Sequence, residues 1–171
     1  MNRSGNGGSS IDHVWAIRDA VAADVMRICE FGDAHIRRHY APLIGDDAAD
    51  RQVVDWWNEV QIQSAVARGL VVVAEAAGDL VGVAQRGWNG SDHVLYKLYL
   101  DPDHQGRGLG PALIDAVIRR LPSDTARLCV EHFAGNVRAA AFYEREHFIV
   151  ERIARSDTSS ALDVVWRARA P

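Results

Sequence analysis

The chain has 171 residues and a formal net charge of −4, with 48% hydrophobic and 25% charged residues. Such a length and composition are typical of one soluble globular domain with a single sizeable core. A nucleic-acid-binding protein would carry a basic stripe, and the apolar runs here are too short to cross a bilayer. We therefore expect one soluble domain over residues 11–171, without nucleic-acid or membrane partners.

The N-terminal segment and the cysteines bear on location and metal content. Residues 1–10 are rich in Asn, Gly and Ser and lack the apolar core of a signal peptide, so we expect a flexible tail. Cys29 and Cys129 are the only cysteines. They are too far apart in sequence to form a metal-ligand motif, and nothing indicates a disulfide between them. We expect no metal cofactor and a reducing, cytoplasmic location.

Hydrophobic periodicity predicts a strand, a helix and then a run of strands in the first hundred residues. Residues 13–18 alternate enough for a strand, and residues 19–31 have helical apolar spacing. Residues 70–75 and 80–88 read as two strands joined by a hairpin, and residues 93–100 as a third.

A further helix is expected between the first helix and the hairpin. Pro42 breaks the chain, and Asp46 or Asp47 could cap the helix that follows. Helical spacing places three apolar residues on one face, where core packing is the ordinary explanation. These residues are Val53, Trp57 and Val60.

A glycine-rich turn after residues 93–100 opens directly onto a helix. Gly106, Gly108 and Gly110 let the backbone turn tightly with its N–H groups inward, and the helix N-terminus adds unsatisfied donors. This pattern predicts an anion cradle for a phosphate-bearing ligand, although a tight strand-to-helix connection is an alternative explanation. The spacing matches neither a P-loop nor a dinucleotide-binding motif.

The remaining residues predict alternating helices and strands. A helix should follow the glycines and end before Pro122, with its apolar face on the core and Arg120 facing water. The later elements are a strand at 127–131, a helix at 136–146 and strands at 148–153 and 162–167. Hairpins followed by strand-helix-strand units indicate a mixed sheet flanked by helices.

Two motifs in this half resemble the GCN5-related N-acetyltransferase (GNAT) family. The stretch from Gln105 to Gly110, which follows Leu-Tyr-Leu-Asp-Pro, is similar to the family's acyl-CoA pyrophosphate loop. The stretch from Arg127 to Phe148 is similar to its strand, asparagine, small-residue helix and tyrosine. The resemblance covers roughly residues 92–150 and implies an α+β fold, with a mainly antiparallel mixed sheet of about seven strands whose strands 4 and 5 splay apart.

The resemblance also implies acetyl-CoA as co-substrate. Where strands 4 and 5 separate, unpaired backbone groups can bind the two amides of a pantetheine arm. Pro111 lacks an N–H and so removes one phosphate donor. The expected cofactor-binding residues are Leu98, Tyr99, Leu100, Gln105, Gly106, Arg107, Gly108, Leu109, Gly110, Pro111, Asn136 and Tyr143.

Acyl transfer to an amine needs a proton donor for the departing thiolate. Tyr143 follows Asn136 by seven residues, so two helical turns put both on one face, and we expect Tyr143 to be the general acid. Core packing of the ring is the alternative.

The turn after this helix departs from the family pattern. The family has Leu-Gly-Phe there, whereas this chain has His147 in place of the glycine. Because glycine adopts a left-handed cap more easily than histidine, we expect a reshaped turn.

The general base is expected to be Glu131. Its place five residues before Asn136 is similar to that of the glutamate in bacterial ribosomal-protein alanine acetyltransferases. A solvated charge at a strand end is the alternative explanation, and His132, Glu75 and His93 are rival bases.

In this family the acceptor pocket is built largely by the N-terminal helices, here residues 31–68. That region carries the acidic residues Asp33, Asp46, Asp47, Asp50, Asp55 and Glu59 beside the ring-bearing residues His35, His39, Tyr40, Trp56 and Trp57. An acidic aromatic pocket would favour a cationic acceptor, whereas a solvated helix face is the ordinary explanation.

The resemblance thus implies an N-acetyltransferase acting on a primary amine of a small molecule. A protein N-terminus or a lysine is an alternative acceptor, and a non-catalytic acyl-CoA sensor is an alternative function. Analogy with the family also allows a homodimer.

Overall fold

The computed structural model describes residues 15–171, so the tail expected over residues 1–10 lies outside the described residues. The strands are β1 (Trp15–Asp19), β2 (Val71–Ala76), β3 (Asp79–Asn89), β4 (Asp92–Leu100), β5 (Leu128–Phe133), β6 (Ile149–Ala154) and β7 (Val164–Arg169). The helices are η1 (Ala22–Asp24), α1 (Val25–Ile44), α2 (Asp46–Trp56), α3 (Glu59–Ala67), η2 (Pro102–His104), α4 (Leu109–Ile118), α5 (Val137–Arg145) and η3 (Ser160–Leu162).

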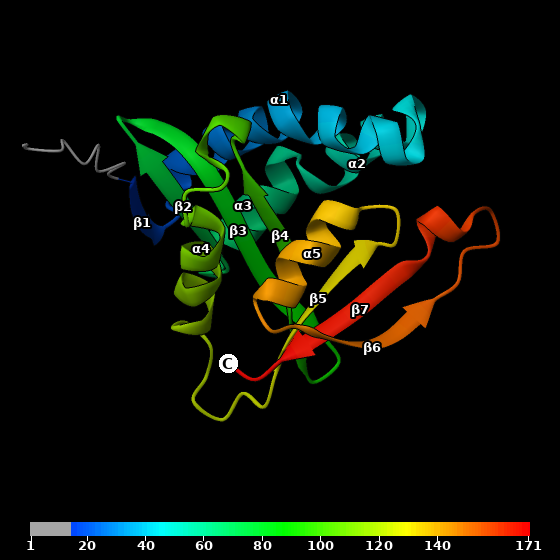
Figure 1. Ribbon diagram of the computed structural model, residues 1–171. Coiled ribbons are helices and arrows are strands. Elements are labelled where there is room, and N and C mark those ends of the chain that lie inside the picture. Colours follow the sequence, from blue (N-terminus) through cyan, green and yellow to red (C-terminus); the bar gives the residue numbers. More distant parts are fainter. Residues whose placement is uncertain (1–14) are drawn as a thin grey trace, which may run out of the picture.

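The strands form one seven-stranded sheet in the order β1-β2-β3-β4-β5-β7-β6 (Figure 1). Neighbouring strands are antiparallel except β4 and β5, which are parallel. The expected α+β fold with a mixed, mainly antiparallel sheet is therefore confirmed.

Each face of the sheet is covered by its own set of helices. Along β2, Val71 and Val73 join the core under α1, α2 and α3, whereas Val72 and Ala74 join the core under α4 and α5. This alternation is the period of two expected of a strand that is buried on both faces. Strand β2 thus lies between two helical layers, α1 to α3 on one face and α4 and α5 on the other. Figure 1 shows the helices on both sides of the sheet.

Strands β4 and β5 pair only at one end of the sheet. Their registered partners stop at Leu95 and Val130, although both strands continue. On its other side β4 has a bulge at Tyr96, because Lys97 pairs with Gln85 while Leu95 pairs with the next residue of β3. A bulge bends its strand and increases the local twist, which explains why the separation starts there. The expected splay of strands 4 and 5 is confirmed.

Helix α1 is longer than the sequence predicts. It continues past residue 31 to Ile44 and contains Pro42 in its last turn, where the missing N–H removes a single helical hydrogen bond. Gly45, with φ of 84°, ends α1 and also precedes α2. Asp46 and Asp47 therefore lie in the first turn of α2, and neither is its N-cap.

The apolar face predicted from Val53, Trp57 and Val60 is interrupted. Val53 and Trp57 are buried, but Val60 is 74% exposed. Helix α2 ends before Trp57, and Asn58 starts α3 by accepting a hydrogen bond from the backbone N–H of Gln61, which restarts the helical phase. The prediction that Val60 shares the core-facing surface was wrong.

Helix α4 also ends earlier than expected, at Ile118, before the turn that leads to Pro122. Arg120 lies in that turn and is half-buried, not facing water as predicted. Its Nε donates to Asp19 Oδ1 at 2.6 Å, which ties the end of α4 to β1.

Candidate active site

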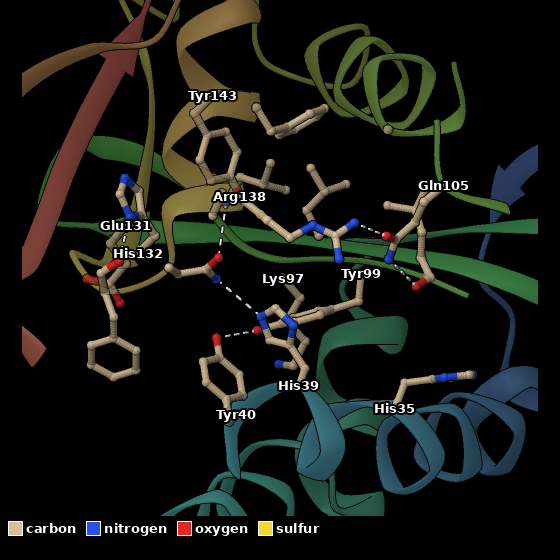
Figure 2. Close-up of a pocket in the computed structure, with 18 of the residues that line it drawn as sticks. His35, His39, Tyr40, Lys97, Tyr99, Gln105, Glu131, His132, Arg138 and Tyr143 are labelled. Carbon is tan, nitrogen blue, oxygen red and sulfur yellow. Dashed lines mark hydrogen bonds between the residues drawn. The ribbon is translucent and has the colours of Figure 1, made fainter. Parts of the chain in front are cut away.

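A cleft of about 1260 Å³ lies where β4 and β5 separate. Its walls come from β4, β5, the glycine-rich loop, the length of α5, and α1 to α3 (Figure 2). The two helical layers and the open strand edges therefore meet in one cavity.

The glycine-rich loop has the conformation its sequence requires. Gly106 and Gly108 have φ of 73° and 82°, in the left-handed region that side chains disfavour, and Gly108 is the N-cap of α4. Within the described chain, the N–H groups of Gly106, Gly108, Leu109 and Gly110 donate to no backbone carbonyl. Free N–H groups at a helix N-terminus are suited to bind a phosphate.

Most of the predicted cofactor residues share this cleft. Those that line it are Leu98, Tyr99, Leu100, Gln105, Gly106, Gly108, Gly110, Pro111, Asn136 and Tyr143, whereas Arg107 and Leu109 do not. The Leu109 side chain is buried in the core, so only its backbone can face a ligand. Gly110 allows close packing of α4 on α5, because a Cβ there would lie 3.0 Å from Phe142.

Arg138, on the first turn of α5, is a candidate that the sequence analysis missed. Its Nη2 donates to Gln105 Oε1 at 2.5 Å, and Gln105 Nε2 donates to the Leu100 carbonyl at 3.5 Å (Figure 2). The guanidinium therefore reaches from α5 toward the glycine-rich loop. The only sequence signal for it is a cation two residues after the motif asparagine.

Asn136 caps α5 and also makes a contact across the cleft. Its Oδ1 accepts from the N–H of Ala139 at 3.1 Å, and its Nδ2 lies 3.2 Å from His39 Nε2 on α1 (Figure 2). One side chain thus fixes the start of α5 and links it to the opposite helical layer.

Tyr143 is 8% exposed and packs among aromatic rings while lining the cleft. Its ring stacks on His132 with centroids 6.0 Å apart and meets Phe148 edge-on at 5.5 Å. Burial raises the pKa of the phenol well above its usual value, so the hydroxyl keeps its proton at neutral pH. Within residues 15–171, no side chain or carbonyl hydrogen-bonds this hydroxyl.

The turn after α5 is retained despite the missing glycine. His147 takes φ of +65°, the Phe148 N–H bonds the Tyr143 carbonyl at 2.9 Å, and the His147 N–H bonds the Glu144 carbonyl at 3.0 Å. These bonds form a Schellman cap with His in place of Gly. The expected reshaping of the turn was wrong, because the chain accepts the strain of a positive φ at His147.

Glu131 lies on β5 immediately after the last residue paired with β4, and it lines the cleft. Its carboxylate is open to the cleft, and partial burial on the cleft wall raises its pKa above the usual value. Figure 2 shows Glu131 beside His132 on the wall of the cleft below Tyr143.

The rival bases are occupied or lie elsewhere. Glu75 bonds Arg18 and Arg27, which lowers its pKa, and it does not line the cleft. His93 is buried outside the cleft. His132 lines the cleft, but its Nε2 accepts from Arg167 Nε at 3.1 Å and its Nδ1 lies 2.9 Å from a carbonyl.

The acceptor side differs from the acidic pocket considered above. All six acidic residues of the helical region are exposed and none lines the cleft, whereas the five ring-bearing residues named with them do. Helical phase explains this, because the acidic side chains point away from the sheet and ion pairs such as Arg37–Asp50 hold them there. The cations that line the cleft are Arg38, Lys97, Arg138 and Arg145.

Aromatic contacts close this side. Tyr40 and Tyr99 share a hydrogen bond between their hydroxyls at 2.6 Å, and Trp57 packs edge-on against Tyr99 at 5.4 Å. These contacts fix α1 and the α2–α3 junction against β4.

Within residues 15–171 no group of three or more metal-binding side chains occurs. Across the same residues, the helices lack the length and apolarity needed to span a membrane.

Residues 67–150 match the sequence profile of the acetyltransferase (GNAT) domain. The chain is 35% identical over 116 residues to a mycothiol acetyltransferase of Propionibacterium freudenreichii, a match that covers 63% of this chain and 34% of that protein. It is also 32% identical over 122 residues to the L-amino acid N-acyltransferase MnaT of Escherichia coli, covering 68% of this chain and 66% of that protein. The chain thus spans about a third of the length of the first relative.

The fold is similar to that of solved structures. The PaiA N-acetyltransferase of Thermoplasma acidophilum, solved in complex with coenzyme A, superposes with a TM-score of 0.78 at 17% identity, covering 92% of this chain and 99% of that one. At this identity the likeness concerns the fold.

Proposed function

Because this chain belongs to the GNAT acetyltransferase family, we propose that it transfers an acetyl group from acetyl-CoA to a primary amine of a small molecule. The observation that carries the proposal is the convergence of three features on one cleft. The glycine-rich loop, the unpaired edges of β4 and β5, and the side chains of Tyr143 and Glu131 all line it.

The cofactor half of the cleft has the donors that a CoA ester needs. The backbone N–H groups of Gly106, Gly108, Leu109 and Gly110 can bind the pyrophosphate. Arg138, which bonds Gln105 at the start of this loop, adds a guanidinium. The backbone of Leu98 to Leu100 lies beyond the last β4–β5 pair, where it can bind the amides of the pantetheine arm.

Acetyl transfer then needs one base and one acid from the protein. Glu131 accepts a proton from the acceptor ammonium, directly or through water, and its raised pKa brings it closer to neutrality, where a base works best. The amine nitrogen bonds the carbonyl carbon of the thioester, and the carbon–sulfur bond breaks. Tyr143 donates its phenolic proton to the departing sulfur, and the second proton that the nitrogen loses on becoming an amide restores the phenol, directly or through water.

Two observations support a small acceptor over a protein chain. The Tyr40–Tyr99 and His39–Asn136 contacts link α1 to β4 and to α5 across the acceptor side. The relative MnaT is named for L-amino acids, and the other relative for mycothiol.

The proposal is tested by free-thiol release from acetyl-CoA with a panel of amines, together with the thermal unfolding of the purified protein. Acetyl-CoA should raise Tm, because a ligand that binds only the folded state stabilises it. Absence of a Tm shift at millimolar acetyl-CoA would exclude cofactor binding. A Tm shift without turnover of any amine would identify a sensor.

A further inference from the structure

Lys97 is the only lysine in the chain, and all other basic side chains apart from histidine are arginine. It lies on β4 one residue beyond the Tyr96 bulge and is 6% exposed while lining the cleft. Its Nζ donates to Gln85 Oε1 at 2.7 Å and lies 5.4 Å from the centre of the Trp57 ring. The chain's only lysine thus lies in the wall of the candidate active site.

This ammonium has no negative partner in the described structure. Among residues 15–171 no carboxylate forms an ion pair with Lys97, and burial lowers its pKa to about 8. Buried charges in proteins are normally paired, because desolvation without a counter-ion is costly. An amide oxygen and a ring face compensate only part of that cost.

Lys97 faces the acceptor side of the sheet. Its cross-strand neighbour Gln85 and its contact Trp57 lie on the face covered by α1 to α3, whereas Leu98 packs in the core on the opposite face. Lys97 and Glu131 follow the last β4–β5 pair by two residues and one residue respectively, so they flank the same opening. An acceptor whose amine approaches Glu131 therefore has Lys97 on the other strand.

We propose that Lys97 and Gln85 form a carboxylate-binding subsite, and that the acceptor is an amine that also carries a carboxylate, as an amino acid does. This inference rests on the proposed acetyl transfer and names its substrate class. The bound carboxylate supplies the counter-ion that Lys97 lacks, and the NH2 group of Gln85 provides a second donor. A single buried ammonium matches the single charge of a carboxylate, whereas a phosphate dianion is usually bound by several cations or a row of N–H groups.

The subsite is tested by comparing acids with amides in the full-length protein. Each of the twenty L-amino acids, its carboxamide and its decarboxylated amine is assayed with acetyl-CoA by free-thiol release, in wild type and Lys97→Gln. The ratio of wild-type to variant kcat/KM for one acceptor cancels that acceptor's own amine pKa. We expect this ratio to be at least about 10-fold for the acids, as for loss of a charged hydrogen bond, and below about 2-fold for amides and amines.

Arg51→Gln serves as a matched control, since it removes one positive charge from the exposed surface of α2 away from the cleft. The acetyl-CoA Kd should not change in either variant, because Lys97 lies on the acceptor side. Equal loss for acids and amides would overturn the subsite and indicate that Lys97 acts in the chemistry. An unchanged ratio for all acceptors would also overturn it, while acetyl transfer to amines would stand.

If no acceptor is turned over, the proposed acetyl transfer is contradicted. The carboxylate subsite is then tested by a binding measurement. The same acids are titrated calorimetrically into protein saturated with CoA. Binding to wild type that Lys97→Gln weakens about 10-fold would support the subsite, and lack of binding would overturn it.

Lys97→Met should also raise Tm of the unliganded protein by about 2–4 °C, because an unpaired buried charge is removed.

Discussion

The two halves of the cleft are built on different principles. The cofactor half depends on the main chain: positive φ at Gly106 and Gly108, a helix N-terminus, and the strand edges left open beyond Leu95. The acceptor half depends on side chains, among them the Tyr40–Tyr99 hydroxyl pair and the single lysine. A site built from the main chain allows few residue types at its key positions, whereas a site built from side chains can change on an unchanged backbone. One fold can therefore keep its cofactor and change its acceptor.

The largest expected effect is at Tyr143, where the two halves meet. Tyr143→Phe should lower kcat by about 100-fold or more, because general acid catalysis is worth roughly 10²–10⁴-fold, and should change the acetyl-CoA Kd less than about 2-fold. Steady-state kinetics and calorimetry measure the two quantities. Tyr96→Phe is the matched control: Tyr96 also lines the cleft, but its hydroxyl bonds the Trp88 carbonyl at 2.9 Å, and Trp88 does not line the cleft. An unchanged rate in Tyr143→Phe would remove this residue as the acid.

Glu131→Gln should lower kcat/KM by about 10-fold to 100-fold near neutral pH, with part of the loss recovered at high pH. The raised pKa of Glu131 means that the wild-type carboxyl gains its proton, and loses its function as a base, at a higher pH than an ordinary glutamate. The wild-type pH profile should therefore have an acidic limb that the variant lacks. Identical profiles would exclude the role of base.

A substitution in the glycine-rich loop should have a smaller effect, and it tests whether this loop binds the cofactor or only connects β4 to α4. Gly108→Ala should weaken acetyl-CoA binding about 10-fold, because an alanine in the left-handed region costs about 1–2 kcal/mol and the loop must relax. Gly90→Ala imposes similar strain at φ of 62° in the β3–β4 hairpin. Both variants should lose similar stability in denaturant unfolding, and only Gly108→Ala should lose affinity. Equal affinities would mean that the loop does not hold the ligand.

The smallest expected effect concerns the turn after α5. His147→Gly should stabilise the fold by about 0.5–1 kcal/mol, since glycine adopts the left-handed cap without strain. Ala77→Gly relieves the same strain at φ of 52° in the β2–β3 hairpin and should give a similar gain in Tm. If only His147→Gly were destabilising, side-chain contacts of His147 would have to hold the turn.

The same contrast explains what the sequence could predict. The glycine-rich loop, the cap at Asn136 and the strand segments along the chain depend on local backbone requirements, which glycine, asparagine and periodicity reveal. The bulge at Tyr96 has no such signal, because it needs neither glycine nor proline, yet the separation of β4 from β5 begins there. Its presence follows from pairing across the whole sheet.

The acceptor half was less predictable because its helices are set by tertiary packing. Pro42 suggested a break, but its position in the last turn of α1 costs a single hydrogen bond. Trp57 packs against Gly32, where a Cβ would lie 2.5 Å from the ring, a contact between residues that no short-range pattern links. Lys97 did leave a signal, as the chain's only lysine, but nothing in the sequence placed it in the cleft.

The most direct test of the central claim is a crystal structure of the protein with bound CoA. The diphosphate should lie on the N–H groups between Gly106 and Gly110, and the pantetheine arm should pass between β4 and β5 beyond Leu95, toward Tyr143. Electron density for CoA at another site, or β4 and β5 paired along their whole length in the complex, would contradict the account.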